Sequence, residues 1–192
     1  MRFALAVPVG LLFATAACHH RPDVVMTSVR YPGHDEGVRP PARLPNQRIF
    51  IVVENHRGAE PSIGEDNSTH VPIHADPEAL ARMVDAGFKT ELTRLGVRVA
   101  SGPQDSDLVL KVGLNEVKVV ENVTYYATLL TVMEVTDSGG NSLGRFPIQG
   151  EAGHWGDDYS GPEVNATLNN ALAALISNAL QNPELMHMLG AP

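Results

Sequence analysis

Apolar and polar residues follow two periods along this chain, one of two residues and one of three to four, and both begin only near residue 47. Alternation at every second residue predicts half-buried strands, and short continuous apolar runs predict buried ones. The strands predicted in this way cover residues 49–53, 97–100, 108–119, 124–136 and 143–152. Within 108–119 the apolar phase shifts after Leu114, which predicts a bulge near Asn115 and Glu116.

The longer period predicts two amphipathic helices. The first follows Asp76 and Pro77, which are favoured at a helix start, and ends at Gly96. The second covers residues 163–181 and ends at Asn182-Pro183, after which residues 185–189 add one more turn. The side chains that we expect in the core come from both helices and from the sheet: Phe88, Leu92, Leu110, Val112, Leu168 and Leu172.

The order of these elements predicts the fold class. Residues 54–73 are rich in Gly, Pro, Ser, Asn and acidic residues, so we expect a long irregular loop there. Short connections and a right-handed crossover place the first helix on one face of the sheet, and the second helix joins it there. The sequence therefore predicts one α+β domain over residues 47–192. It has two layers, a mostly antiparallel sheet of four to five strands and two helices packed on one face.

The first eighteen residues have the pattern of an export signal. Arg2 provides a positive start, residues 3–13 are apolar, and small residues precede Cys18, which is the only cysteine of the chain. In one interpretation residues 1–17 are a signal peptide and Cys18 is lipidated. In the other, an ordinary signal is cut after Ala16 and leaves a free thiol. Acylation removes a thiol that would be a liability in an oxidising compartment, which favours lipidation.

Charge and composition restrict the partners of the protein. From Gln47 onward the chain has nine Lys or Arg against nineteen Asp or Glu, a difference of −10. Nucleic acids and anionic lipid headgroups require the opposite sign, so we expect no nucleic-acid partner and membrane attachment through the lipid alone. Residues 18–46 carry the lipid and several prolines without apolar periodicity, which predicts a disordered tether.

The segment Thr15-Ala16-Ala17-Cys18 resembles the bacterial lipobox, and the order of elements after it resembles that of the YajG-like bacterial lipoproteins. The residues that carry this second likeness are 49–53, Leu92 to Gly96, Asp107 to Leu110, Asp137 to Asn141 and Gly150 to Tyr159. The resemblance implies a protein anchored in the cell envelope, without catalytic residues. Because His19 follows Cys18, it also implies sorting to the periplasmic face of the outer membrane.

Candidate chemistry is sparse. The sequence has no G-x-S-x-G motif and no phosphate-binding glycine loop, so we expect neither an enzyme nor a cofactor. His70 and His74 have the spacing of two metal ligands on one helix, but Pro72 lies between them and opposes a helix. We therefore expect solvated histidines and no metal.

One loop combines aromatic and acidic residues between a strand and a helix. It contains His154, Trp155, Asp157, Asp158 and Tyr159, and Trp155 is the only tryptophan. Aromatic rings beside carboxylates could bind a sugar, and peptidoglycan is the glycan nearest to an envelope lipoprotein. The commoner role of such a tryptophan is to close the end of a core, and we prefer that interpretation.

Residues 124–136 provide a second candidate site. Tyr125, Ala127, Leu129, Met133 and Val135 form the more apolar phase and should face the helices. The opposite phase still contains Tyr126, Leu130 and Val132, which is more apolar than solvation requires. We expect this face to bind another envelope protein, unless the tether or residues 54–73 cover it. The alternative functions are an accessory subunit of a lipid or lipopolysaccharide transport machine and a glycan-binding protein.

Overall fold

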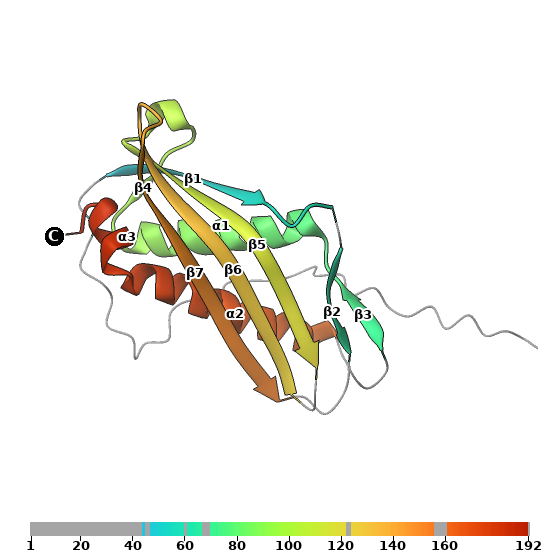
Figure 1. Ribbon diagram of the computed structural model, residues 1–192. Helices are drawn as coiled ribbons and strands as arrows, with labels where there is room; N and C mark the ends of the chain where they lie inside the picture. The colour runs from blue at the N-terminus through green and yellow to red at the C-terminus, as the bar shows by residue number, and fades with distance from the viewer. Residues whose placement is uncertain are drawn as a thin grey trace, which may run out of the picture.

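A computed structural model describes Leu44 and residues 47–59, 61–66, 70–121, 124–155 and 161–191, apart from the side chains of Asp66 and Val71. Cys18 and the predicted tether lie outside these ranges, apart from Leu44, which is buried in the core and whose backbone N–H donates a hydrogen bond of 3.1 Å to the Leu95 carbonyl. Within the described ranges, the chain forms a seven-stranded sheet and three α-helices (Figure 1). In chain order the elements are β1 (Arg48–Asn55), β2 (Ser62–Asp66), β3 (Val71–His74), α1 (Pro77–Arg94), β4 (Arg98–Val99), the short 3-10 helix η1 (Pro103–Asp105), β5 (Leu108–Glu121), β6 (Thr124–Asp137), β7 (Ser142–Trp155), α2 (Gly161–Gln181) and α3 (Pro183–Met188).

The sheet is mixed, and this corrects the prediction of a mostly antiparallel sheet of four to five strands. On one edge of β5, β1 pairs in parallel from Leu108 to Leu114, and β2 pairs in parallel from Val119 to Glu121. On the other edge, β6 pairs antiparallel to β5, and β7 antiparallel to β6. The parallel pairs arise because α1 carries the chain back across the sheet between β1 and β5.

The prediction of an irregular loop over residues 54–73 is wrong, because this segment contains the end of β1, all of β2 and most of β3. Among the side chains of β2 and β3 that the structure describes, only Ile63 and Ile73 are fully buried, so these strands show little hydrophobic pattern. These strands pair through their backbones. At Gly64 the backbone of β2 lies so close to β5 that a Cβ there would overlap the Val119 carbonyl. A glycine is therefore required for this close approach.

Helix α1 begins and ends as its sequence predicts. The Asp76 carboxylate accepts a hydrogen bond from the backbone N–H of Glu78 at 3.0 Å, and Pro77 occupies the first turn. After the helix, Gly96 adopts a positive φ of 95°, which favours glycine. The predicted core is confirmed, since its six side chains are at most 1% exposed.

Helix α2 packs directly on the edge strand β7. A Cβ at Gly150 would collide with the Ala171 carbonyl oxygen and the Leu175 nitrogen of α2. The Asn178 side chain donates a hydrogen bond of 2.7 Å to the carbonyl of Gln149. The backbone groups of every second residue of β7 point to its free edge. At the next such position, Pro147, the backbone has no N–H to donate. Helix and proline together leave this edge poorly suited to pairing with a further strand.

Within the described ranges, one face of the sheet carries no helix. Figure 1 shows α1 and α2 on the same side of the sheet, as predicted. The opposite side, which we name the open face, belongs mainly to β5, β6 and β7. The predicted bulge is confirmed, because the register of β5 and β6 shifts between Leu114 and Glu116 and turns Asn115 toward this face.

Candidate functional site on the open face

The alternation along β6 places the predicted interface residues on the open face. The predicted inward phase of β6 is at most 1% exposed, at Tyr125, Ala127, Leu129, Met133 and Val135. Tyr126 is 57% exposed, and Leu130 and Val132 are half-buried. The two aliphatic side chains can therefore lose further contact with water if a partner covers them.

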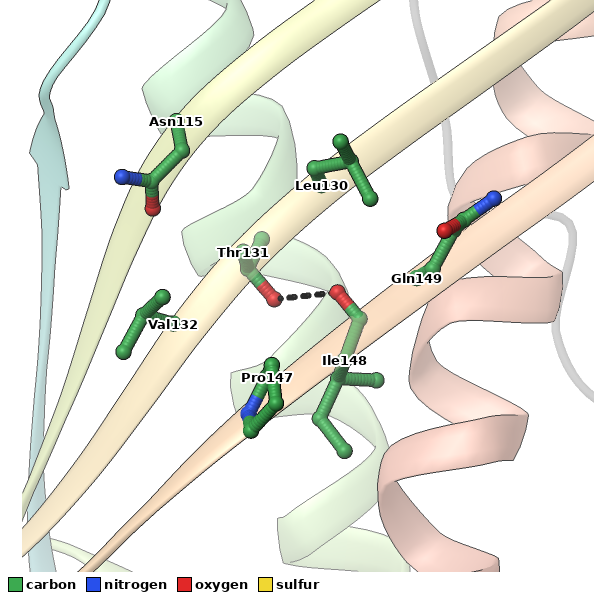
Figure 2. A pocket seen from close by; sticks show the side chains of 7 residues that line it. All are labelled: Asn115, Leu130, Thr131, Val132, Pro147, Ile148 and Gln149. Carbon is green, nitrogen blue, oxygen red and sulfur yellow. Dashed lines mark hydrogen bonds between the residues drawn. The ribbon is translucent and has the colours of Figure 1, made fainter.

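Leu130 and Val132 line a depression of about 320 Å³ in the middle of this face. Figure 2 shows them between Asn115 of β5 and the β7 residues Pro147 and Gln149, with the helices behind the strands. Below them, the hydroxyl of Thr131 donates a hydrogen bond of 3.1 Å to the Ile148 carbonyl and joins β6 to β7. The depression therefore has an apolar floor and amide groups at its sides.

His56 covers the part of the open face beside this depression. A Cβ at Gly113 would lie 2.6 Å from a carbon of the His56 ring, so the ring rests on the glycine of β5. Nε2 of His56 is 3.1 Å from a carboxylate oxygen of Glu54, which holds the ring in place. Sequence analysis missed His56, and the glycine inside an alternating strand was the signal that could have indicated it.

Two rows of charged and polar side chains run across the strands, one on each side of the depression. Across the strands, Lys111, Glu134 and Arg145 are in register in one row. Lys118, Thr128 and Glu151 are in register in the other. Charges at the edge of an apolar area are the usual composition of a protein interface. A partner could therefore bury the centre of this face while these charges stay in contact with water.

Trp155 does not close the core, and this corrects our preferred interpretation of its loop. It is 78% exposed and stands on the open face at the end of β7, opposite Thr124 in the register. The strand continues to Trp155, so its side chain follows the outward phase of Gly153. At Gly153 a Cβ would lie 3.0 Å from the Tyr126 ring, which therefore packs on this glycine.

The structure does not bring the whole predicted loop together. His154 points to the helix layer, where its Nε2 lies 2.6 Å from a carboxylate oxygen of Glu163 in the first turn of α2. His154 and Trp155 thus lie on opposite faces of β7. Asp157, Asp158 and Tyr159 lie outside the described residues.

The described part of the chain contains no cluster of three His, Cys, Asp or Glu residues that could hold a metal ion. His70 pairs with Glu65 at 2.6 Å, while His74 lies at the other end of β3 and is half-buried. Over the same residues, no helix is long and apolar enough to cross a membrane.

Comparison with known proteins shows the fold alone. No family model and no curated protein matches the sequence. The crystal structure of a Xanthomonas campestris protein of family model DUF330 is similar with a TM-score of 0.55 and 14% identity, over 83% of this chain and 94% of that one. The structure of a minor lipoprotein from Acinetobacter baumannii has a TM-score of 0.48 and 10% identity, over 75% and 95%. The YajG-like family stays a prediction, and what the chain shares with the Xanthomonas protein is the α+β fold.

Proposed function

We propose that this protein is a lipid-anchored lipoprotein of the cell envelope, and that it acts without catalysis by binding another envelope protein through its open face. The observation that carries this proposal is the apolar depression around Leu130 and Val132 on a sheet face that no helix covers. The N-terminal pattern that ends at Cys18 supports the lipid anchor and the envelope location, which we assign to the periplasmic side of the outer membrane.

The depression has the anatomy of an interface centre. Leu130, Val132 and Pro147 offer apolar surface, and Asn115 and Gln149 offer amide donors and acceptors for specific hydrogen bonds. Tyr126 and Trp155 extend the surface with the residue types that most often dominate binding energy. A protein partner of complementary shape would desolvate this centre and leave Lys111, Arg145 and Lys118 at the rim.

Crosslinking in intact cells tests the proposal. The double variant Leu130→Thr, Val132→Thr should lose its crosslinked partner while its melting temperature stays nearly unchanged, because Thr is β-branched and suits a partly solvated strand face. Leu143→Thr is the matched control, since Leu143 is 40% exposed on β7 and does not line the depression. A large fall in melting temperature of the double variant would show that these side chains belong to the core. Unchanged crosslinking would remove the depression as the docking site.

A further inference from the structure

Two aromatic side chains are exposed together in the corner of the open face where β6 begins and β7 ends. Tyr126 lies opposite Gly153, and Trp155 is two residues further along β7 on the same face. Diagonal neighbours in an antiparallel pair are separated by about 7–8 Å, within reach of aromatic side chains. The two rings are therefore neighbours, and both expose most of their surface, 57% and 78%.

Gly153 decides how the tyrosine ring lies. The nearest Tyr126 ring carbons would be 3.0 and 3.3 Å from a Cβ at Gly153, so the ring rests where any other side chain would stand. The ring packs against the strand on one side and remains accessible on the other. Trp155 adds a second aromatic surface beside it. We name this corner, with Tyr126 and Trp155, the platform.

A row of hydrogen-bonding side chains borders this platform. Two residues along each strand from the aromatic corner, the register places Lys118, Thr128 and Glu151 side by side on the same face. The Gln149 amide donates to the Glu151 carboxylate and orients it. Lys118 is exposed, and the ion pairs of the described residues do not include it. An ammonium, a hydroxyl and a carboxylate thus stand beside two aromatic rings.

We propose that this corner is a saccharide-binding platform, on which a sugar ring of a glycan chain stacks against Tyr126 and Trp155. The C–H face of a pyranose is apolar and flat, and it is attracted to the negative face of an aromatic ring. Sugar hydroxyls both donate and accept, so Glu151, Thr128 and Lys118 can all be satisfied by one ligand. The net charge of −10 from residue 47 onward would repel a nucleic acid. A proline-rich peptide would leave Lys118, Thr128 and Glu151 without hydrogen-bond partners.

This inference does not rest on the protein-docking proposal. Tyr126, Trp155 and Lys118 belong to the wider docking surface as well, but the depression around Leu130 and Val132 that carries that proposal contains none of them. Leu130 is four residues from Tyr126 along β6, and the polar row lies between them. A variant of the depression should therefore keep sugar binding. This separates the failure of one proposal from the failure of the other.

The single tryptophan provides a direct measurement. Full-length protein in detergent is titrated with a tetramer of β-1,4-linked N-acetylglucosamine, and the emission of Trp155 is recorded. We expect a saturable change. Tyr126→Ala should weaken the affinity by about tenfold, the loss of one aromatic contact, while Tyr126→Phe should retain it. Glu151→Gln should also weaken binding. Leu143→Ala, at the other end of β7, and the double variant Leu130→Thr, Val132→Thr should bind like the original protein.

Three results would overturn the proposal. The first is the absence of a saturable change in emission. The second is unchanged affinity in Tyr126→Ala, which would show that the sugar contacts Trp155 without stacking on Tyr126. The third is a response to a polyproline peptide and none to the sugar, which would assign the corner to peptide recognition. Because Tyr126 is exposed, its variants should keep the far-ultraviolet circular dichroism of the folded protein.

Discussion

At the scale of single residues, two glycines of β7 show that the free-energy cost of adding a side chain depends on the face of the strand to which it points. Gly150 points to the helix layer, where a Cβ would collide with backbone atoms of α2. Gly153 points to the open face, where the nearest atoms belong to the exposed ring of Tyr126. Backbone atoms in a packed helix cannot give way, whereas an exposed ring can rotate.

Gly150→Ala should therefore destabilise the protein strongly. Inserting a group into a packed core typically costs about 1–3 kcal/mol, and we expect more than about 3 kcal/mol because the whole helix must shift. Gly153→Ala on the same strand is the matched control and should cost less than about 1 kcal/mol. Urea unfolding of the two variants measures the difference. Equal stability of the two would contradict the close packing of α2 on β7.

A second residue-scale prediction concerns acid stability. The pKa of Asp107 lies below its ordinary value of 3.8, mainly because the side chain of Arg48 donates a hydrogen bond to the carboxylate. The backbone N–H of Arg48 donates a second one, and both measure 2.9 Å. The carboxylate therefore stabilises the fold above its unfolded pKa, and this stability is lost as the pH falls through the lower folded pKa.

Asp107→Asn should thus lower the urea midpoint at about pH 6, and this deficit should shrink at acidic pH, as the pH falls through the lowered folded pKa of Asp107. The exposed carboxylate Glu184, changed to Gln, serves as control and should show little deficit at either pH. A deficit that stays constant with pH would mean that the ion pair does not contribute through its charge.

At the scale of elements, α1 shows a helix whose sequence contains all that is needed to place it. Its cap, its apolar stripe and its terminal glycine all indicate the same helix, and the stripe is buried as predicted. Strands β2 and β3 show the opposite case. Each has one fully buried side chain among those described, and the two strands form because β5 offers an unpaired edge beyond the end of β1.

The stripe of α1 can be tested at Leu92, which is 0% exposed. Leu92→Ala removes buried methyl groups and leaves a cavity, so it should cost about 2–5 kcal/mol of unfolding free energy. The neighbouring exposed residue provides the control, and Thr93→Ala should change stability by less than about 0.5 kcal/mol. A small effect at Leu92 would show that α1 packs through another side.

At the scale of the whole molecule, a layer of helices covers one face of the sheet, and no helix of the described residues lies on the other face (Figure 1). The proposed lipid at Cys18 is separated from β1 by twenty-nine residues of sequence, 19–47. Two acyl chains give stable membrane binding, whereas one gives only marginal binding. In our proposal, the position of the protein in the envelope thus depends on a single cysteine.

Cys18→Ala should release the protein from membrane fractions and abolish labelling by a clickable fatty acid. The matched control is Thr15→Ala, which keeps a small residue before the cysteine and should leave labelling intact. Labelling that persists in Cys18→Ala would contradict the lipid anchor. Recovery of the original protein only in inner-membrane fractions would contradict the proposed sorting.

The sequence by itself determined the long elements, because caps, periodicity and turn residues act locally: α1, α2, β5 with its bulge, β6 and β7 all lie where their patterns predict. It also determined which phase of β6 is buried. Only the tertiary structure decided that β1 and β2 pair in parallel with one edge of β5. Strands pair through backbone hydrogen bonds, which leave no pattern of side chains in the sequence. The tertiary structure alone identified His56 and Tyr126 as the side chains that rest on Gly113 and Gly153, because a glycine within a strand indicates a close approach but not the residue that makes it.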